Sequence, residues 1–170
     1  MVFSLDTSFE SLDEFPVLAD FESPWETSRW GGDAEITRDR GFAQNGRYSL
    51  KIELNTTTYS GVSLNYFPSD WKGFKDLQFD LFNPSDKALN VTCRIHDALH
   101  AENELRYNDR FNRSYRLEPG WNAIRIPLAD VAAAPRTRTM NLQAIRDFSI
   151  FAVRLSQPQT LYLDHVRLER

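Results

Sequence analysis

Apolar and polar residues alternate along the stretch from Leu89 to His96. Successive side chains of a β-strand point to opposite faces, so this alternation predicts a strand with one face in a core and the other in solvent. Cys93 lies on the apolar face, where we expect a small buried hydrophobe rather than a reactive thiol. The apolar positions are Leu89, Val91, Cys93 and Ile95, and the polar positions are Asn90, Thr92, Arg94 and His96.

The same alternation recurs along most of the chain and predicts about nine or ten short strands. Gly and Pro mark the turns between them, and only residues 129–147 favour a helix. Many short strands at this spacing favour an all-β fold, a sandwich of two antiparallel sheets. The expected core residues are Leu50, Ile52, Leu64, Leu77, Phe79, Leu81, Val91, Cys93, Ile95, Ile124, Ile126, Phe151 and Leu163.

The length of 170 residues suits one domain that builds a core without a metal or disulfide. We expect an acidic leader over residues 1–15 and a single β-sandwich domain over residues 16–170. The net charge of −4 disfavours a general nucleic-acid binder. No apolar run approaches the ~20 residues of a membrane span, and a single cysteine excludes an internal disulfide.

The polar face of the strand at residues 89–96 leads into a segment rich in arginine, histidine, carboxylate and aromatic side chains. Guanidinium forks and aromatic planes suit a polar ligand that contains rings. Residues 109, 111, 113 and 115 share a parity on the next expected strand, so we predict one groove formed by both strands. The alternative is a solvated sheet face with cross-strand charge pairs. The predicted groove residues are Arg94, His96, Asp109, Phe111 and Arg113.

Three segments of the chain carry a resemblance to a known family: LADFES, NGRYSLKIEL and LYLDHVRLER. Over residues 16–170 the chain resembles carbohydrate-binding modules with a galactose-binding-like jelly roll, including modules attached to bacterial β-glucanases and xylanases. It is more distantly similar to the domain of complex I intermediate-associated assembly factors. The resemblance implies a jelly-roll sandwich, but not the ligand, because this architecture hosts many functions.

The resemblance also implies a structural calcium where the first strand, the turn before SLK and the last strand meet. Carried over by position, Glu22 and Asp164 would supply carboxylate oxygens, with Asp20 as a further candidate. Backbone carbonyls from Gln44 to Arg47 would complete the shell, as a hard cation prefers oxygen ligands. The turn reads QNGR, without an additional acid, which departs from the family pattern. The alternative is that both acids are ordinary surface residues.

Modules of this family bind glycans on one sheet face, with aromatic rings against sugar rings. We therefore expect a polysaccharide or oligosaccharide as the partner. The richness in Arg and His departs from modules for neutral β-glucans and indicates an anionic ligand, such as a uronic-acid or phosphorylated glycan. Trp30 and Trp71 could form the rim, although tryptophan is more often a core residue. The expected ligand-binding residues are Arg94, His96, Asp97, Tyr107, Asp109, Phe111, Arg113, Trp30 and Trp71.

Two other functions use the same residues. A polysaccharide lyase would use Arg, His and Tyr to neutralise a uronate and move a proton, whereas a glycosidase would pair acids drawn from Asp97, Asp109 and Glu104. A protein-interaction or assembly domain would instead expose an apolar patch. No glycine-rich phosphate loop or Cys/His zinc spacing appears in the sequence. We expect a non-catalytic module that is part of a larger protein. The sequence leaves the localisation open, and a larger chain would favour an extracytoplasmic one.

Overall fold

The computed structural model describes residues 14–170, so the expected leader over residues 1–15 lies almost wholly outside the described residues. The strands are β1 (Val17–Ala19), β2 (Trp30–Gly31), β3 (Glu35–Asp39), β4 (Ser49–Leu54), β5 (Tyr59–Leu64), β6 (Asp76–Asn83), β7 (Leu89–Asp97), β8 (Phe111–Leu117), β9 (Gly120–Pro127), β10 (Ile145–Val153) and β11 (Gln159–Glu169). The short helical segments are η1 (Glu26–Arg29), α2 (Leu99–Glu102), η2 (Tyr107–Asp109) and α3 (Leu128–Ala133).

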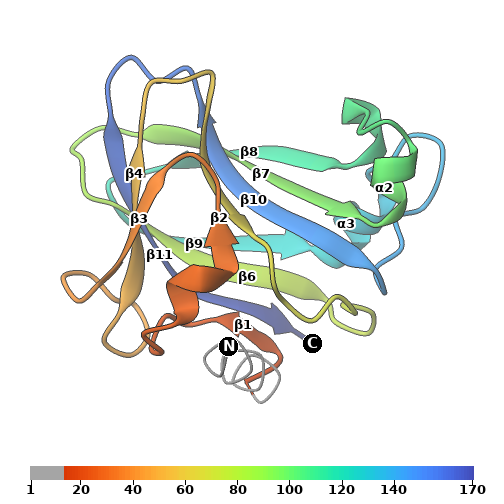
Figure 1. Ribbon diagram of the computed structural model, residues 1–170, viewed down its shortest axis with the longest axis horizontal. Coiled ribbons are helices and arrows are strands. Elements are labelled where there is room, and N and C mark those ends of the chain that lie inside the picture. Colours follow the sequence, from red (N-terminus) through yellow and green to blue (C-terminus); the bar gives the residue numbers. More distant parts are fainter. Residues whose placement is uncertain (1–13) are drawn as a thin grey trace.

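The strands form two antiparallel sheets that pack face to face (Figure 1). The six-stranded sheet has the order β3-β4-β11-β6-β9, with β1 also paired to β11. The five-stranded sheet has the order β2-β5-β10-β7-β8. Neighbours in each sheet are mostly distant in sequence, as in a jelly roll. The predicted all-β, two-sheet antiparallel sandwich is confirmed.

The core lies between the two sheets, where the inward side chains of both meet. In the six-stranded sheet, Phe79 is fully buried and packs 5.2 Å from Phe148 of the opposite sheet, measured between ring centroids. Cys93 is also fully buried, and burial raises the pKa of its thiol, so this cysteine is a packing residue. All the expected core residues are buried except Phe151.

Phe151 was expected in the core, and this prediction is wrong. On β10 the buried positions are Phe148, Ile150 and Ala152, which have the opposite parity. The Phe151 ring is only partly buried and meets the ring of Tyr59 edge to face, 5.8 Å away between centroids. Two adjacent large apolar residues, Ile150 and Phe151, made both parities plausible from the sequence. Pairing of Ile150 with Cys93 determines which side faces the core.

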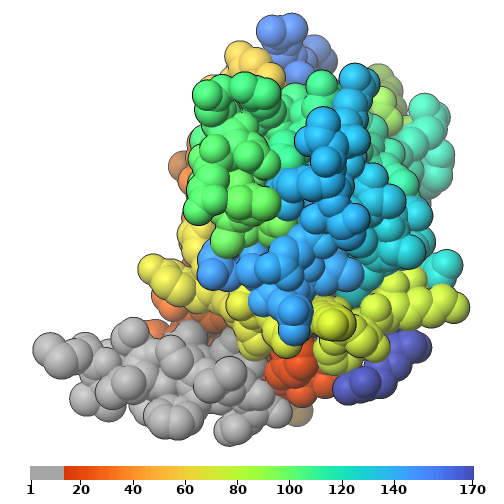
Figure 2. Space-filling view, turned by 90° about the vertical axis from the view of Figure 1, so that its right-hand side faces the viewer, coloured from red at the N-terminus to blue at the C-terminus, as the bar shows by residue number. Residues whose placement is uncertain are grey.

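The loops that contain α2 and η2 and the segment after α3 lie together at one end of the sandwich (Figure 1). Figure 2 looks onto this end and shows the green chain near residue 100 beside the light-blue chain near residues 130–145. Most of the polar residues that were expected to bind the ligand fall in two places, on the outer face of the five-stranded sheet and in the loops at this end, whereas Arg113 lies on the inner side of β8.

Candidate functional site

The register between β7 and β8 separates the residues that were expected to share one groove. Ile95 pairs with Phe111 and Cys93 pairs with Arg113, whereas Arg94 pairs with Asn112. Paired residues of an antiparallel ladder project to the same face. Phe111 is accordingly buried in the core, and Arg113 lies on the inner side, at the edge. The predicted convergence of Arg94 with Phe111 and Arg113 is wrong.

Arg113 makes its contacts away from Arg94. Its Nη1 lies 3.1 Å from Oδ2 of Asp130 in α3, and its guanidinium lies 5.0 Å from the ring centroid of Phe111. Both partners of the ion pair are more than one-third exposed. Arg113 therefore links the edge strand to α3.

Arg94 and its neighbours form a polar network on the outside of the five-stranded sheet. Nε of Arg94 donates to Oδ2 of Asp147 at 2.8 Å, and Nη2 donates to Oγ of Ser149 at 3.0 Å. Ser149 donates to Oδ1 of Asp147 at 2.8 Å and also lies 2.6 Å from Oγ of Ser63. Asp147 and Ser149 are buried, but the Arg94 side chain is 30% exposed. The network therefore holds a partly exposed guanidinium in a fixed orientation.

His96 borders this network and is the second predicted residue on this face. Its Nε2 lies 3.7 Å from Oδ2 of Asp147, and Nδ1 lies 3.2 Å from the backbone oxygen of Asp97. Burial lowers the pKa of His96, and the charge of Asp147 opposes this effect only in part. A neutral imidazole beside Asp147 is therefore expected at neutral pH.

Aromatic rings lie on both sides of the network. Tyr59 of β5 is 65% exposed, and Tyr107 of η2, on the β8 side, is 67% exposed. The guanidinium of Arg94 lies 5.9 Å from the ring centroid of Phe151, which contacts Tyr59. Exposed tyrosine rings beside fixed polar groups are suited to stack on and hydrogen-bond a ligand that has rings.

Arg110 supplies a second cation on this face. Its guanidinium lies 5.4 Å from the ring centroid of Tyr107, and its Nε donates to Oδ1 of Asn112 at 3.1 Å. Burial lowers the pKa of Arg110, and the charge of Arg94 lowers it further. Asp147 and both tyrosines act on the same guanidinium in the opposite sense. These groups are therefore within electrostatic range of one another.

We call this surface the outer face and define it by the residues named above. Tyr59, Phe151, Arg110, Asp147 and Ser149 were not predicted from the sequence. The signal that could have found Asp147 is a carboxylate between Ile145 and Phe148, inside an otherwise apolar strand. The outer-face residues are Tyr59, Ser63, Arg94, His96, Tyr107, Arg110, Asn112, Asp147, Ser149 and Phe151.

Asp97 and Asp109 were expected to bind the ligand, but both are occupied by Arg138. Arg138 donates to the two oxygens of Asp97 at 2.7 and 2.8 Å, and to those of Asp109 at 2.7 and 2.9 Å. Both carboxylates are buried. Burial raises the pKa of Asp97, but the Arg138 and Asn141 hydrogen bonds outweigh it, and the net pKa is lowered. We call these three charged residues the Arg138 clamp.

The Arg138 clamp also lowers the pKa of Asp109, chiefly through the guanidinium hydrogen bonds. Nδ2 of Asn103 and Nδ1 of His100 lie 3.1 and 3.2 Å from Oδ2 of Asp109. The fully buried His100 ring stacks near His96, with 4.6 Å between the two ring centroids. Asp109 therefore fixes the loop between α2 and β8 and does not reach the outer face.

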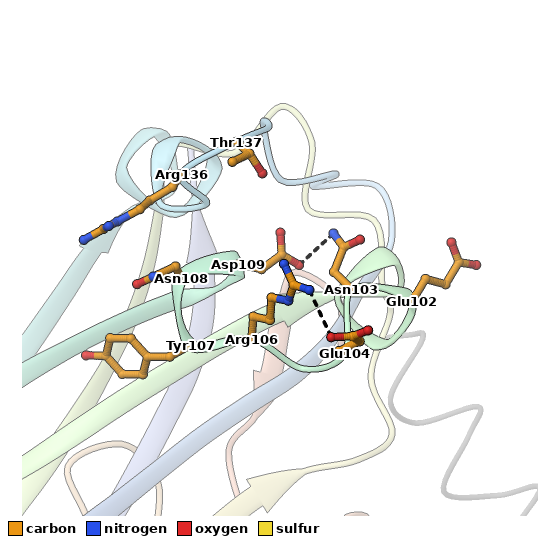
Figure 3. Close-up of a pocket in the computed structure, with 9 residues that line it drawn as sticks. All are labelled: Glu102, Asn103, Glu104, Arg106, Tyr107, Asn108, Asp109, Arg136 and Thr137. Atoms are coloured by element: carbon orange, nitrogen blue, oxygen red, sulfur yellow. Dashed lines mark hydrogen bonds and ion pairs between the residues drawn. The ribbon is translucent and has the colours of Figure 1, made fainter.

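A cavity of about 570 Å³ is lined in part by Asp109 of the Arg138 clamp, and we call it the loop cavity. Figure 3 shows the residues that line it. Its walls come from the loop between α2 and β8 and from the segment after α3. Tyr107 lines this cavity and also borders the outer face. The lining residues are Glu102, Asn103, Glu104, Arg106, Tyr107, Asn108, Asp109, Arg136 and Thr137.

The two tryptophans expected at the rim lie in the core. Trp71 is fully buried, and its Nε1 donates to the backbone oxygen of Pro68 at 3.0 Å. Trp30 is 6% exposed and its ring lies 5.7 Å from that of Phe21, between centroids. Their large apolar surface favours burial over exposure. The predicted role of Trp30 and Trp71 as a rim is wrong.

The turn at residues 44–48 brings together two of the residues expected to hold calcium. Oδ2 of Asp164 accepts from the backbone nitrogens of Gln44 and Asn45, each at 2.8 Å. The Glu22 carboxylate accepts from those of Arg47 and Tyr48 at 2.8 and 2.9 Å. The negative charge of Glu22 also acts on Asp164. The segment that follows β1 and the last strand, β11, therefore meet at this turn.

The fit of this junction to calcium is incomplete. The turn directs N–H groups, rather than carbonyls, at both carboxylates, so Arg47 acts as a donor. Oδ1 of Asp20 accepts from the backbone nitrogen of Glu22 at 3.1 Å. Within residues 14–170, no three His, Cys, Asp or Glu side chains are grouped to hold a metal. Calcium at Glu22 and Asp164 stays a prediction.

No helix within residues 14–170 is long and apolar enough to cross a membrane.

No protein-family model matches the chain, and no curated protein matches it. Similarity appears instead among solved structures, and it is structural rather than sequence-based.

A family 11 carbohydrate-binding module from Clostridium thermocellum, in complex with a β-1,3-1,4-mixed-linked tetrasaccharide, has a TM-score of 0.67 at 16% identity. The match covers 90% of this chain and 94% of that module. An exo-β-agarase has a TM-score of 0.67 at 18% identity, over 90% of this chain but only 24% of the enzyme. A carbohydrate-binding module of family 28, specific for non-crystalline cellulose, has a TM-score of 0.62 at 14% identity, over 92% and 93% of the two chains.

At these low identities the likeness establishes the fold. The chain has the jelly-roll architecture seen in carbohydrate-binding modules, as the resemblance implied. The more distant similarity to complex I assembly factors stays a prediction. The match to only a quarter of the agarase also means that the activity of that whole enzyme cannot be transferred to this chain.

Proposed function

We propose that this protein is a non-catalytic carbohydrate-binding module whose glycan lies on the outer face. The observation that carries the proposal is the pair of exposed rings, Tyr59 and Tyr107, on either side of the fixed Arg94. Tyrosine rings stack on sugar rings while their hydroxyls stay hydrated. A guanidinium that is oriented before the ligand arrives loses little conformational entropy on binding. The carbohydrate-binding modules with the same fold support this proposal.

We further propose that the glycan is anionic. Arg94 and Arg110 are within range of one carboxylate, Asp147, so the outer face carries an excess of positive charge. Asp147 and Ser149 occupy Nε and Nη2 of Arg94, which leaves Nη1 for a ligand. Guanidinium groups form short, charge-assisted hydrogen bonds with carboxylates and phosphates. A uronic acid or a phosphorylated sugar would supply such a group.

The acids proposed for glycoside hydrolysis are poorly placed for it. Asp97 and Asp109 are buried in the Arg138 clamp and have lowered pKa values, whereas a general acid needs a raised pKa. A lyase would depend on the outer face instead, with His96 beside Asp147. We propose binding without turnover, and the test below includes lyase activity.

The test compares acidic and neutral polysaccharides by affinity electrophoresis and by calorimetry. We expect polygalacturonate or alginate to retain the wild-type protein more strongly than mixed-linkage β-glucan. Arg110→Ala should weaken acidic binding about tenfold, as expected for a lost hydrogen bond to a charged group. Arg40→Ala is the matched control, since Arg40 is an exposed arginine that follows β3 in the opposite sheet.

Absorbance of unsaturated products and reducing-end assays on the same mixtures test for catalysis. Retention without product release agrees with a binding module. Product release at a steady rate would make the outer face a lyase site. Equal retention of acidic and neutral polymers would contradict the anionic ligand, and no retention of any polymer would contradict the proposed function.

A further inference from the structure

The loop cavity opens beside the outer face, and Tyr107 belongs to both. Arg110 of the outer face lies 5.4 Å from the Tyr107 ring centroid. Tyr107 also lines the cavity, and its ring points outward, away from Asn103 and Asp109 (Figure 3). A glycan that stacks on Tyr107 from the outer face would therefore reach the mouth of the cavity with its next sugar unit. This continuity relates the cavity to the proposed function.

The lining of the loop cavity suits a sugar better than an apolar ligand. Asn103, Asn108 and Thr137 contribute amide and hydroxyl groups. The charged lining residues are of both signs, the guanidinium groups of Arg106 and Arg136 and the carboxylates of Glu102, Glu104 and Asp109, and Nη2 of Arg106 pairs with Oε2 of Glu104 at 3.0 Å. These side chains supply both donors and acceptors, as sugar hydroxyls require. The volume of about 570 Å³ lies within the ~300–1,000 Å³ that is usual for small-ligand sites.

The walls of the cavity are held in place before any ligand arrives. The Arg138 clamp joins the end of β7 and η2 to the segment after α3 through two hydrogen bonds to each carboxylate. The backbone nitrogen of Arg136 also donates to the backbone oxygen of Asn108 at 3.0 Å, which joins the two segments that line the cavity. Asn103 donates to Asp109 from the same wall.

A buried cluster of charges adds little to the free energy of unfolding, because the cost of removing the charges from water offsets most of the attraction between them. Its value is greater for fixing the relative position of two loops. Asp97 and Asp109 belong to elements that are separated in sequence from Arg138, so the clamp joins segments that are not neighbours along the chain. Such positioning is expected where the loops must present a formed site to a ligand.

We propose that the loop cavity is a second subsite, which binds one further sugar unit of the glycan on the outer face. In this proposal Arg138 is a positioning residue, which acts through Asp97 and Asp109 and does not touch the sugar. The inference rests on the proposed function, because the glycan must first lie on the outer face. It goes beyond that function because it assigns a sugar ligand to the loop cavity and a positioning role to the Arg138 clamp.

The test is calorimetry with oligogalacturonates and alginate oligosaccharides from disaccharide to octasaccharide. We expect the affinity of the wild-type protein to rise with length until the cavity is filled, and then to stay constant. The double variant Asn108→Ala/Thr137→Ala removes side chains from both walls but keeps the backbone bond between Asn108 and Arg136. It should lose about tenfold in affinity for long oligosaccharides and none for the disaccharide.

Arg138→Lys keeps the positive charge, but an ammonium group cannot make two hydrogen bonds to each of the two carboxylates, as the guanidinium does. In this variant we expect the affinity not to rise with oligosaccharide length. The affinity for the disaccharide and the binding stoichiometry should stay as in the wild type. A merely structural role would instead lower the stoichiometry for every length. Glu118→Gln, on an exposed acid outside the cavity, is the control and should change none of these values.

The outcomes separate the two proposals. Binding that does not depend on length, or that the double variant leaves unchanged at every length, overturns the second subsite and leaves the outer face as the binding site. An equal loss for short and long oligosaccharides also overturns it. If the wild-type protein binds no oligosaccharide of either series, the proposed function fails, and the subsite fails with it.

Discussion

Nε of Arg94 lies 2.8 Å from Oδ2 of Asp147, although the two residues are 53 positions apart in the chain. The pair spans β7 and β10, which are neighbours in the five-stranded sheet. It orients a partly exposed cation and at the same time compensates a buried carboxylate. Arg94 therefore contributes both to the proposed binding surface and to stability.

The first prediction concerns this pair. Arg94→Ala should lower the free energy of unfolding by about 1 to 3 kcal/mol, because it leaves the Asp147 carboxylate buried without its cation. Asp147→Asn in the same background should recover part of the loss. A double-mutant cycle by urea denaturation measures the coupling, expected at about 1 to 2 kcal/mol. Additive losses would mean that the two side chains do not interact in solution.

The second prediction concerns ionic strength. If Arg94 and Arg110 face an anionic group, added salt should weaken the binding of an acidic polysaccharide, because exposed charges are screened over ~8 Å at physiological ionic strength. Binding measured by calorimetry from low to high salt should fall steadily for the wild-type protein and less steeply for Arg110→Ala. The same slope in both proteins would exclude Arg110 from the ion contact.

The third prediction compares two phenylalanines, one in the core and one on the outer face. Phe79 is fully buried between the sheets, so Phe79→Ala should cost about 3 to 5 kcal/mol in the free energy of unfolding. Phe151→Ala removes the same ring from the outer face and should cost about 1 kcal/mol or less, as is usual at partly exposed positions. Thermal and chemical denaturation of both variants gives the comparison. Equal costs would place Phe151 in the core.

The sequence predicted most of the core because parity along a strand is a local property. In β7 the apolar face is unbroken from Leu89 to Ile95, and the structure buries that face. Parity was misleading on β8 because it was extended back to Asp109, which lies in η2 before the strand begins. Phe111 and Leu117 share a parity and are both large and apolar, which was the local signal that this side faces the core.

The site was less predictable than the core because its residues come from strands that meet only in the fold. No local pattern links Arg94 to Asp147 or Tyr59 to Phe151. The Arg138 clamp is a similar case, since Arg138 lies in a loop and Asp97 at the end of a strand. A charged residue at the end of an alternating strand indicates a polar site. The sequence pattern is the same whether the partner of that residue is a ligand or another side chain.

The fourth prediction concerns pH and the junction of Asp164 with the turn at residues 44–48. Burial, together with the negative charge of Glu22, raises the pKa of Asp164 to about 6, despite hydrogen bonds from the backbone of Asn45, Gln44 and His165. An unfolded aspartate has a pKa of about 3.9. Between these values the folded state binds more protons than the unfolded state, so stability falls as pH rises.

The contribution of Asp164 should amount to roughly 2 to 3 kcal/mol, favourable below pH ~4 and lost above pH ~6. Asp97 and Asp109 act in the opposite sense, because their lowered pKa values stabilise the fold above pH ~4 and this stabilisation is lost in stronger acid. His96 and His165 have lowered pKa values and favour the fold above pH ~6.5. The test is therefore the difference between wild-type and Asp164→Asn unfolding free energies as a function of pH.

That difference should change between pH ~4 and ~6, whereas an unchanged difference would show that Asp164 titrates normally. Repeating the series with calcium tests the cation predicted at Glu22 and Asp164. Bound calcium would stabilise the folded state by mass action and would keep Asp164 ionised, which removes its pH dependence above pH ~4. If calcium leaves both the melting temperature and the pH dependence unchanged, the backbone N–H groups of the turn are sufficient for these carboxylates and the predicted calcium site is absent.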